Sequence, residues 1–344
     1  MTMPEVPAST ASARPAGGGE AEPSRSRAPG PVAKKRMLII VNPHATTVSD
    51  RLKNLVVYAL QGRYEVETVT TEAQNHATEI GRQACNGGYD IVVAFGGDGT
   101  LNEVANGLAG TDVPISVLPG GSTNVVCRTL GIPNDVVDAT EHLLSLADDF
   151  HPRKIDLGDV SGRRFVFACG VGLDATVVQR VDSHPALKRR AGHYYYAWSA
   201  ISGFYRRYLR NPVRMNVTVD EREVEGITAI AQNSDPFTYF RRYPIRVCED
   251  VALDDGRLSL AVLKRAAQRD VPTLIPRLLN PRLRARDHRQ IEHFDGTLRA
   301  TIRSVSRDGS GAVRPFPVQV DGDYIGERSE AELSVHPAAL TVVA

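Results

Sequence analysis

The chain has 344 residues, 42% of them hydrophobic and 24% charged, with a formal net charge of +1. This length exceeds what one hydrophobic core usually supports and indicates two domains. The near-neutral charge excludes a strong electrostatic field over the whole surface, so any basic patch has to be local. The four cysteines are widely spaced and form no Cys-x-x-Cys pair, which argues against a zinc or redox motif and for reduced thiols in a cytoplasm.

The N-terminal region shows no sign of a membrane or targeting segment. No segment of the chain has the roughly 18 to 20 consecutive apolar residues that a membrane-spanning helix needs, and no apolar stretch typical of a signal peptide opens it. Residues 1–33 are rich in Pro, Ala, Gly, Ser and Arg and poor in side chains that could bury a face. We predict a disordered tail over 1–33 and an ordered chain from Lys34.

Predicted strands and helices alternate from residue 34 to 155. Residues 37–41 form a continuous apolar run that Asn42-Pro43 stops, which is typical of a strand buried on both faces. Apolar positions recur at helical spacing from Ser49 to Gln61. The pattern continues with a strand over 64–69, a helix over 73–85, a strand over 89–95, a helix over 101–108 and a strand over 115–118. This order predicts an α/β domain with a parallel sheet, whose ligands bind beyond the C-terminal ends of the strands.

Residues 156–344 show a different sequence pattern. Short strand-like runs separated by turns predict a β-rich second domain, with helical insertions near 185–210 and 270–285. The last strand is a candidate to return to the first domain. The predicted runs are 164–169, 214–219, 227–231, 258–263, 297–302 and 316–320.

A glycine-rich segment, Gly96-Gly97-Asp98-Gly99-Thr100, follows the strand that ends at Phe95. Glycines permit a tight turn and a close approach of backbone N–H groups to an anion, and the helix that follows adds its positive end. The carboxylate of Asp98 can hold Mg²⁺ and orient phosphates through it. Taken alone, the segment is equally consistent with a turn in which Asp98 caps a helix.

A second loop, Gly120-Gly121-Ser122-Thr123-Asn124, repeats this design at the end of the next strand. Its two hydroxyls and one amide can hydrogen-bond a phosphate or a ribose. A helix that starts at Ser122 or Thr123 is the alternative. Neither loop contains a Walker motif or a Gly-x-Gly-x-x-Gly fingerprint. Two such loops at one edge of a sheet favour a nucleotide crevice.

Several segments, in this order and spacing, resemble the diacylglycerol kinase and sphingosine kinase superfamily. In the first domain these are Val41-Asn42-Pro43, residues 95–108, residues 118–124, Arg128 and residues 130–133. In the second domain they are residues 155–158, 170–175, 253–258 and 320–323. The resemblance covers almost the whole of the predicted ordered chain.

The resemblance implies that residues 34–155 form an α/β domain that binds ATP. It implies that residues 156–344 form a β-sandwich domain that contributes to the lipid site. ATP and Mg²⁺ are the implied cofactors, with Asp98 in the acidic network around the metal. The implied nucleotide-binding residues are Asn42, Pro43, Thr46, Gly96, Gly97, Asp98, Gly99, Thr100, Glu103, Gly120, Gly121, Ser122, Thr123 and Asn124.

The resemblance also implies that Asp321 is the general base for the lipid hydroxyl, supported by Asp323, where relatives usually carry Glu. Phosphoryl transfer needs neutralised phosphate charge and a carboxylate that accepts a proton, which Asp98 and Asp321 can provide. Without the resemblance, Asp321-Gly322-Asp323 is typical of a hairpin turn between two strands.

Three positions depart from the family pattern. Residues 44–47 read His-Ala-Thr-Thr where relatives commonly have a glycine-rich turn, so hydroxyls such as that of Thr46 would contact the phosphates. Val125 stands where many bacterial diacylglycerol kinases carry Asp, and we expect Asp156 to compensate as a metal ligand, with a surface turn as the alternative. Residues 233–239 replace a glycine-rich stretch near the substrate cleft, which leaves the lipid acceptor open.

Residues 183–219 contain no Asp or Glu, and their basic residues are interspersed with aromatic ones. This composition suits an anionic lipid surface. We expect Trp198, Arg206, Arg207 and Arg210 to contact the membrane, and a second basic run over 277–289 to extend the patch. The alternative is a solvated face whose aromatic rings pack on the second domain.

The sequence therefore predicts an ATP- and Mg²⁺-dependent lipid kinase that converts diacylglycerol to phosphatidic acid. A sphingoid base or another lipid alcohol is the alternative acceptor. A NAD kinase, or an inactive regulator that binds lipid or nucleotide, stays open as a different class of protein. We expect a cytoplasmic protein at the inner face of the membrane, with a lipid substrate as partner and no nucleic acid; a homodimer is left open.

Overall fold

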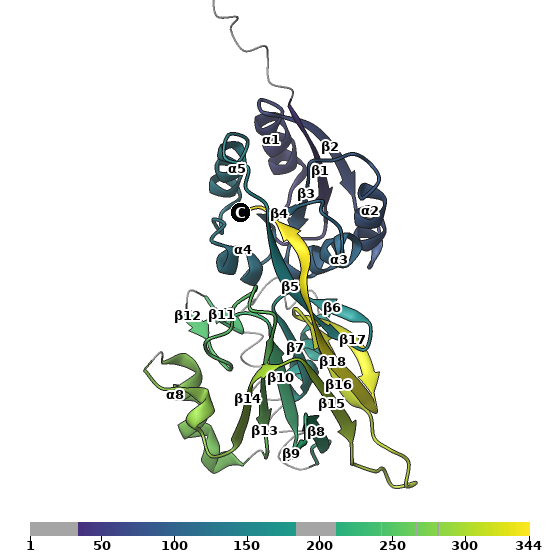
Figure 1. Cartoon of the computed structure of the whole chain (residues 1–344), viewed down its shortest axis with the longest axis vertical. Coiled ribbons are helices and arrows are strands. Elements are labelled where there is room, and N and C mark those ends of the chain that lie inside the picture. The colour runs from purple at the N-terminus through teal and green to yellow at the C-terminus, as the bar shows by residue number, and fades with distance from the viewer. Residues whose placement is uncertain (1–33, 184–210, 242, 266, 281) are drawn as a thin grey trace, which may run out of the picture. The chain divides into compact units, whose positions relative to one another are not determined.

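The computed structural model describes residues 34–183, 211–241, 243–265, 267–280 and 282–344. From Lys34 onwards the chain forms one compact unit (Figure 1). Its first part is an α/β domain and its second part a β-sandwich, so the predicted fold class is confirmed. Within the described ranges, no helix combines the length and the apolar character needed to cross a membrane.

The α/β domain is built on four parallel strands. These are β1 (Lys35–Val41), β2 (Tyr64–Thr70), β3 (Ile91–Gly96) and β4 (Ile115–Pro119), in the spatial order β2-β1-β3-β4. Every residue of β3 and β4 is buried, as expected for parallel strands that are covered on both faces. The C-terminal ends of β1, β3 and β4 therefore lie side by side at one edge of the sheet.

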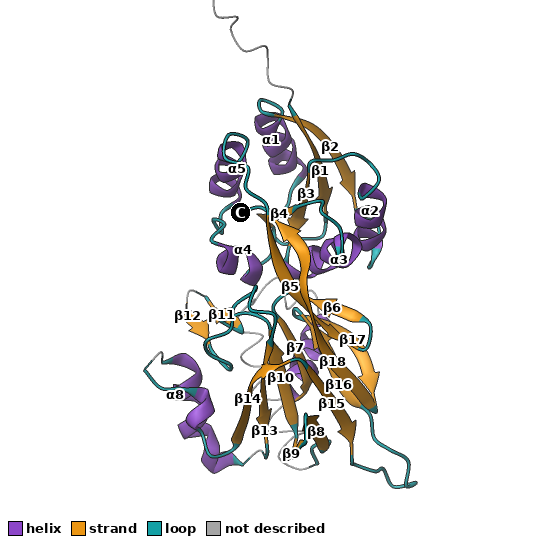
Figure 2. Ribbon diagram, in the orientation of Figure 1, coloured by secondary structure: helices purple, strands orange, loops and turns teal. Residues whose placement is uncertain are grey.

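Helices cover both faces of this sheet (Figure 2). The helices α1 (Asp50–Leu60) and α5 (Val136–Ser145) pack against each other, and so do α2 (His76–Ala84) and α3 (Asp98–Leu108). A short helix, α4 (Val125–Leu130), follows β4. Ser49 begins α1 by accepting a 3.2 Å hydrogen bond from the N–H of Leu52. The helix α3 begins at Asp98, three residues earlier than predicted, so Asp98, Gly99 and Thr100 form its first turn.

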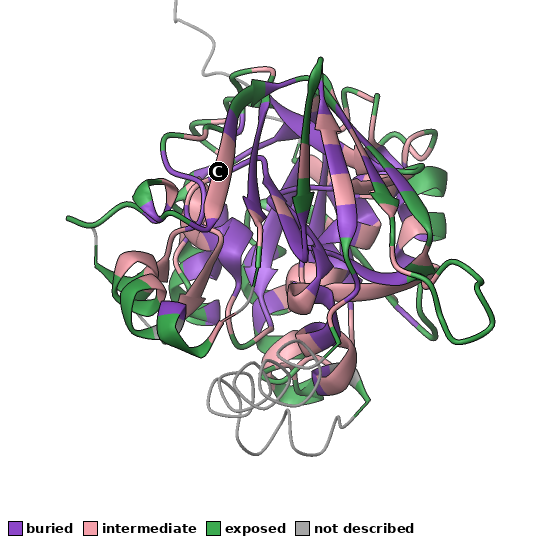
Figure 3. Ribbon diagram, turned by 90° about the horizontal axis from the view of Figure 1, so that it is seen from below, coloured by how far each residue is buried: buried purple, intermediate pink, exposed green. Residues whose placement is uncertain are grey.

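The β-sandwich packs two sheets around an apolar core, whose buried strands Figure 3 shows. One sheet contains β14-β13-β10-β7-β16-β17, which are Ile291–Thr297, Leu258–Leu263, Thr228–Gln232, Ala168–Gly172, Phe316–Val320 and Asp323–Arg328. The other contains β5 (Arg153–Val160), β6 (Arg163–Phe165), β8 (Met215–Val219), β9 (Arg222–Gly226), β15 (Arg299–Ser304) and β18 (Glu330–Val342).

Smaller elements flank the sandwich. They are α6 (Leu173–Asp182), the two-stranded sheet β11 (Thr238–Phe240) and β12 (Tyr243–Ile245), η2 (Gln268–Asp270), α8 (Val271–Leu279) and η3 (Ala285–Asp287). The last three account for the helical insertion predicted near 270–285. The insertion predicted near 185–210 lies outside the described residues.

The long strand β18 joins the two parts of the unit. It pairs antiparallel with β15 and β5, and Val342 near its end pairs parallel with Ile115 of β4. As a result, β1 to β4 and one layer of the sandwich belong to a single ten-stranded sheet. The strand β5 runs through residue 155, where we expected the domain boundary.

Candidate active site

A cleft of about 920 Å³ opens at the C-terminal ends of β1, β3 and β4. Its walls come from the loop after β1, the first turn of α3 and the loop after β4 on one side. On the other side lie α6, the β11–β12 hairpin and the turn between β16 and β17. Parallel α/β sheets bind ligands at this edge, so the cleft lies where the sequence predicts a nucleotide crevice.

The two glycine loops pack directly against each other at the floor of the cleft. The N–H of Gly120 donates a 2.7 Å hydrogen bond to the carbonyl of Gly96. A Cβ atom on Gly120 would lie 2.8 Å from the Cα of Gly96, and one on Gly121 would lie 2.9 Å from the Cα of Gly97. These glycines are therefore needed for the contact between the loops, and Gly96 and Gly120 lie beneath the cleft lining.

The first turn of α3 provides a site for an anion. Gly97 is its N-cap residue, and the first hydrogen bond of the helix runs from the N–H of Leu101 to the carbonyl of Gly97. The N–H groups of Asp98, Gly99 and Thr100 precede this bond and have no carbonyl within the helix to pair with. These three residues line the cleft, so the positive end of an 11-residue helix faces a ligand there.

Two predicted nucleotide residues organise the loops that they line. The amide of Asn42 donates a 2.9 Å hydrogen bond to the hydroxyl of Thr100 and accepts one of 2.9 Å from the N–H of His44. The two carboxylate oxygens of Glu103 accept from the N–H groups of Asn75 and Ala77 at the start of α2. Both side chains shape the cleft through these contacts.

Three of the predicted nucleotide residues offer hydroxyls to a ligand. Thr46, Ser122 and Thr123 line the cleft. Their side chains take part in no hydrogen bond among the residues that the structure describes, and Thr46 and Ser122 are exposed. Hydroxyls in such positions can donate to phosphate oxygens. The position of Thr46 fits the prediction that a hydroxyl contacts the phosphates in place of the glycine-rich turn after Asn42.

Four predicted nucleotide residues do not line the cleft: Pro43, Gly96, Gly120 and Asn124. Asn124 is buried with a φ of +48°, and its side chain accepts from the N–H of Gly121 and donates to the carbonyl of Gly121, both at 2.9 Å. It also donates to the side chain of Asn134. Asn124 therefore holds the second loop in shape, which corrects its assignment as a nucleotide contact.

Asp98 caps the helix that follows the second glycine loop. Its Oδ2 accepts a 3.0 Å hydrogen bond from the N–H of Val125, and its Oδ1 accepts a 3.3 Å bond from Val126. Each oxygen keeps one lone pair for another partner. Burial raises the pKa of Asp98 to about 6, and the nearby charge of Asp321 acts in the same direction.

Asp321 uses all of its acceptor capacity inside the protein. Its Oδ2 accepts from the amide of Asn102 at 2.7 Å and the N–H of Val166 at 2.6 Å. Its Oδ1 accepts from the N–H groups of Phe167 at 2.9 Å and Ala168 at 3.0 Å. Burial still raises the pKa of Asp321, although these four hydrogen bonds lower it. The Asp321 carboxylate thus ties the β16–β17 turn to β7 and α3.

The backbone of this turn matches the hairpin interpretation. Asp321 has a φ of +48° and Gly322 a φ of +84°, which is the left-handed pair that a tight two-residue hairpin requires. The N–H of Gly322 donates a 2.9 Å hydrogen bond to Gln319, whose amide donates to Asp174 at 2.7 Å. Burial raises the pKa of Asp174 to about 6. The hairpin and the predicted acidic site are therefore the same feature.

Asp323 extends from this turn to the α/β domain. A Cβ atom on Gly99 would lie 2.3 Å from the Oδ2 of Asp323, so the carboxylate lies directly over Gly99 in the first turn of α3. Both residues line the cleft, and Asp323 is partly exposed. The carboxylate of Asp323 therefore lies beside the place where the helix end would hold a phosphate.

The cleft also has an apolar wall. Arg128 of α4 supports it by stacking its guanidinium 4.6 Å from the ring centre of Tyr239 and by donating a 3.1 Å hydrogen bond to the carbonyl of Arg241. The second glycine loop, which leads into α4, is thereby connected to the β11–β12 hairpin. The apolar lining residues are Phe167, Val177, Val178, Phe237, Tyr239, Phe240 and Ile245.

The local sequence patterns did not indicate Asn102, Asp174, Gln319 or Arg128 as site residues. Asn102, Asp174 and Arg128 fall in segments that resemble the family, which is the signal that could have identified them. Gln319 lies on a strand, and nothing in its local sequence marks it. Trp198, Arg206, Arg207 and Arg210, predicted to contact a membrane, lie outside the described residues.

The prediction that Asp156 binds metal is not supported by its position. The buried Asp156 accepts hydrogen bonds from the N–H of Gly256 at 2.6 Å and of Ala338 at 2.7 Å. Ala338 lies with a φ of +51° where the register of β18 shifts, between His336 and Leu340. Asp156 therefore stabilises a bulge in β18 and does not line the cleft.

The carboxylates of Asp98 and Asp321 fit magnesium that is also bound by the phosphates of a nucleotide. Across the described ranges, no group of three or more His, Cys, Asp or Glu side chains is arranged to hold a metal. Mg²⁺ is commonly held by one or two carboxylates together with substrate phosphates. Asp98 keeps acceptor capacity, and the charge of Asp321 nearby would make a cation favourable. These residues fit an ion that arrives with a nucleotide, with Asp98 as a ligand.

Comparison with known proteins agrees with this architecture. Residues 36–160 match the diacylglycerol kinase catalytic domain, and residues 168–344 match the YegS C-terminal NAD kinase beta sandwich-like domain. The diacylglycerol kinase of Bacillus subtilis (strain 168) is 30% identical over 244 residues, which are 67% of this chain and 75% of that protein. The diacylglycerol kinase of Staphylococcus haemolyticus (strain JCSC1435) is 27% identical over 241 residues, 68% of each chain.

A solved structure shows the same fold. The crystal structure of a diacylglycerol kinase from Bacillus anthracis (strain Sterne) has a TM-score of 0.64 and 18% sequence identity, over 90% of this chain and 96% of that chain. The two matching domains together span almost all of the described residues, and they meet at the cleft. The chain therefore belongs to the diacylglycerol kinase family of kinases.

Proposed function

We propose that this kinase transfers the γ-phosphate of ATP to the hydroxyl of a membrane lipid, with diacylglycerol as the first candidate acceptor and phosphatidic acid as the product. One observation carries the proposal. A single cleft combines a helix N-terminus and exposed hydroxyls on one wall with acidic and apolar side chains on the other. The first wall would bind the phosphates of ATP, and the second would bind a lipid alcohol.

The nucleotide would bind on the α/β side. The N–H groups at the start of α3 and the hydroxyls of Thr46, Ser122 and Thr123 would hold its phosphates. Mg²⁺ bound at Asp98 would neutralise phosphate charge during the transfer. The contact between the two glycine loops keeps these donors in one fixed arrangement, so little reorganisation is needed when the nucleotide binds.

The acceptor hydroxyl needs a proton acceptor, and the geometry favours Asp323 for this role over Asp321. All four lone-pair positions of Asp321 accept hydrogen bonds from the protein. Asp323 lines the cleft, and its carboxylate lies over Gly99. We therefore propose Asp323 as the general base and Asp321 as the residue that holds the turn in place, which exchanges the roles expected from the resemblance.

The acceptor would lie along the apolar wall formed by the β11–β12 hairpin and α6. Acyl chains bury apolar surface against such a wall, while the hydroxyl reaches Asp323. A sphingoid base or another lipid alcohol meets the same chemistry and is the second candidate. The enzyme would meet its substrate at the inner face of the membrane, from the cytoplasm.

The test is incubation with γ-labelled ATP, Mg²⁺ and separate acceptors, followed by chromatography of the products. The acceptors are diacylglycerol, sphingosine, monoacylglycerol and NAD. We expect label in phosphatidic acid. Label in NADP would contradict a lipid acceptor, and binding of ATP and lipid without any labelled product would assign the chain as a regulator.

A further inference from the structure

The helix α8 exposes apolar side chains on its outer face. Ile275 and Leu279 are each 45% exposed and lie one helical turn apart, and Leu283 after the helix is 39% exposed. The inner face is different, because Leu278 packs on the small core around Val247 and Cys248. Apolar residues on both faces of a surface helix indicate that the outer face has a partner.

The segment that carries this outer face is rich in arginine. The stretch 271–286 contains four Arg and no Asp or Glu, and Asp270 and Asp287 flank it. Two of the four pair with acids of the sandwich, Arg284 with Asp250 at 3.6 Å and Arg286 with Asp295 at 2.8 Å. Arg277 and Arg282 have no acidic partner among the described residues. Arg277 donates a 3.4 Å hydrogen bond to the carbonyl of Arg284, next to Leu283, and Arg282 directly precedes Leu283.

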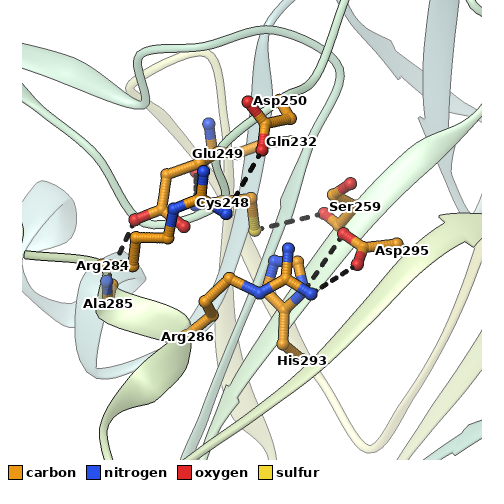
Figure 4. A network of polar contacts seen from close by, with 10 residues as sticks. All are labelled: Gln232, Cys248, Glu249, Asp250, Ser259, Arg284, Ala285, Arg286, His293 and Asp295. Carbon is orange, nitrogen blue, oxygen red and sulfur yellow. Dashed lines mark hydrogen bonds and ion pairs between the residues drawn. The ribbon is translucent and has the colours of Figure 1, made fainter.

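A polar network fixes the segment after α8 to the sandwich (Figure 4). Glu249 accepts a 3.0 Å hydrogen bond from the N–H of Ala285, and Arg286 reaches Asp295 on β14. The N–H of Cys248 donates a 2.8 Å hydrogen bond to the buried side chain of Gln232. The apolar side chains of α8 are therefore presented from a fixed support.

One hairpin lies between α8 and the cleft. The helix contacts β12, where Tyr243 is 53% exposed. Tyr243 pairs with Phe240 of β11, and Phe240 and Tyr239 belong to the apolar wall of the cleft. The β11–β12 hairpin thus carries the exposed Tyr243, contacts α8 and contributes to the wall of the proposed acceptor site.

We propose that Tyr243, Ile275, Leu279 and Leu283, bordered by Arg277 and Arg282, form a docking surface for an anionic lipid bilayer. We call these six residues the α8 surface. Apolar side chains enter the boundary between headgroups and acyl chains, arginines pair with anionic headgroups, and tyrosine favours the headgroup level. The proposal deepens the proposed function, because docking at this place brings the apolar wall of the cleft to the membrane that holds the acceptor.

Vesicle sedimentation of the full chain, without ATP, tests the surface. We expect wild type to bind vesicles of phosphatidylglycerol and phosphatidylcholine and to bind pure phosphatidylcholine weakly. The double variant Ile275→Asp, Leu279→Asp should lose about tenfold or more in affinity for the anionic vesicles. The matched control is Leu55→Asp, Tyr58→Asp on α1, whose side chains are 59% and 80% exposed and which should bind as wild type does.

A second variant separates the charge from the apolar contact. Arg277→Ser, Arg282→Ser should weaken binding several-fold and reduce its sensitivity to salt, while melting temperatures show that all variants are folded. Unchanged binding of the aspartate variant, an equal loss in the α1 control, or no preference of wild type for anionic vesicles would each overturn the proposal. Sedimentation measures binding without turnover, so it tests the surface even if the protein has no kinase activity. Labelling of a dispersed short-chain diacylglycerol needs no docking to a bilayer, so it tests the kinase activity even if docking fails.

Discussion

Gly99 and Asp323 are 224 positions apart in the chain, yet a side chain on the first would collide with the carboxylate of the second at 2.3 Å. The absence of a side chain at Gly99 is thus what lets an acid from the sandwich reach the end of a helix in the α/β domain. In the function that we propose, this contact brings together the parts that phosphoryl transfer requires, a phosphate site and a proton acceptor.

Replacing Gly99 with Ala should reduce turnover about 10²-fold, because the added methyl group displaces the Asp323 carboxylate. Stability should change little, since the clashing atoms are the end of a flexible side chain. Initial rates and melting temperature check this. Gly309→Ala is the control, as a Cβ there meets nothing within 4 Å. A Gly99→Ala enzyme as active as wild type would place Asp323 outside the chemistry.

The two aspartates of the turn should respond differently to Asn. Asp323→Asn should keep the melting temperature of wild type and lose about 10²-fold or more in turnover, and Asp323→Glu should retain substantial activity. Asp321→Asn should be less stable by about 1–3 kcal/mol, because an NH₂ group would face backbone N–H donors. Denaturant unfolding and rates measured on all three variants distinguish the roles. An unstable Asp323→Asn together with a stable, inactive Asp321→Asn would restore Asp321 as the base.

Arg128→Ala should raise the KM for the lipid acceptor about five- to tenfold and leave the KM for ATP nearly unchanged. The reason is that Arg128 supports the β11–β12 hairpin through Tyr239 and the carbonyl of Arg241. Arg36→Ala is the control, because Arg36 stacks on Tyr89 at 4.7 Å and neither residue lines the cleft. Equal effects of the two variants on the acceptor KM would argue against a specific role of Arg128.

The stability of the protein should depend on pH through Asp174. Burial raises its pKa from 3.8 to about 6 in the folded protein, so between these values the folded state binds more protons than the unfolded state. Its ionisation therefore costs stability as pH rises from about 4 to 6, by up to about 3 kcal/mol. Asp174→Asn should be more stable than wild type at pH 7.5 and close to it at pH 4. Chemical denaturation at both pH values measures the difference, and a constant difference would contradict the assignment.

Local sequence patterns were sufficient for the first domain. The buried apolar runs of β1, β3 and β4 and the helical spacing of α1 are properties of contiguous residues, and the structure has each element within a few residues of its predicted bounds. Two local differences remain in this domain. The helix α5 was not predicted, and α3 starts at Asp98, three residues earlier than predicted. The glycines there suggested a loop, but Gly97 serves as an N-cap and the helix includes Gly99, over which Asp323 packs.

The roles of individual polar side chains were less predictable. Asp156 and Asn124 have the residue types of ligands, but their partners are backbone groups that only the folded chain brings close, such as the N–H of Ala338, 182 positions away. The four donors to Asp321 come from Asn102 and from residues 166–168, which no local pattern around Asp321 reveals. Hydrogen-bond saturation is a property of tertiary structure, so the local sequence could not indicate which of Asp321 and Asp323 keeps acceptor capacity.

The pairing of Val342 with Ile115 affects how the chain folds during synthesis. On the outer edge of β4, Ile115 obtains its partner Val342 only after residues 330–342 have been made, when β1 to β4 and their helices have long left the ribosome. Until then β4 presents an unpaired and apolar strand edge, the kind of surface on which chains aggregate. We therefore expect residues 34–155 produced alone to be poorly soluble, and nascent chains to depend on chaperones until β18 closes the sheet.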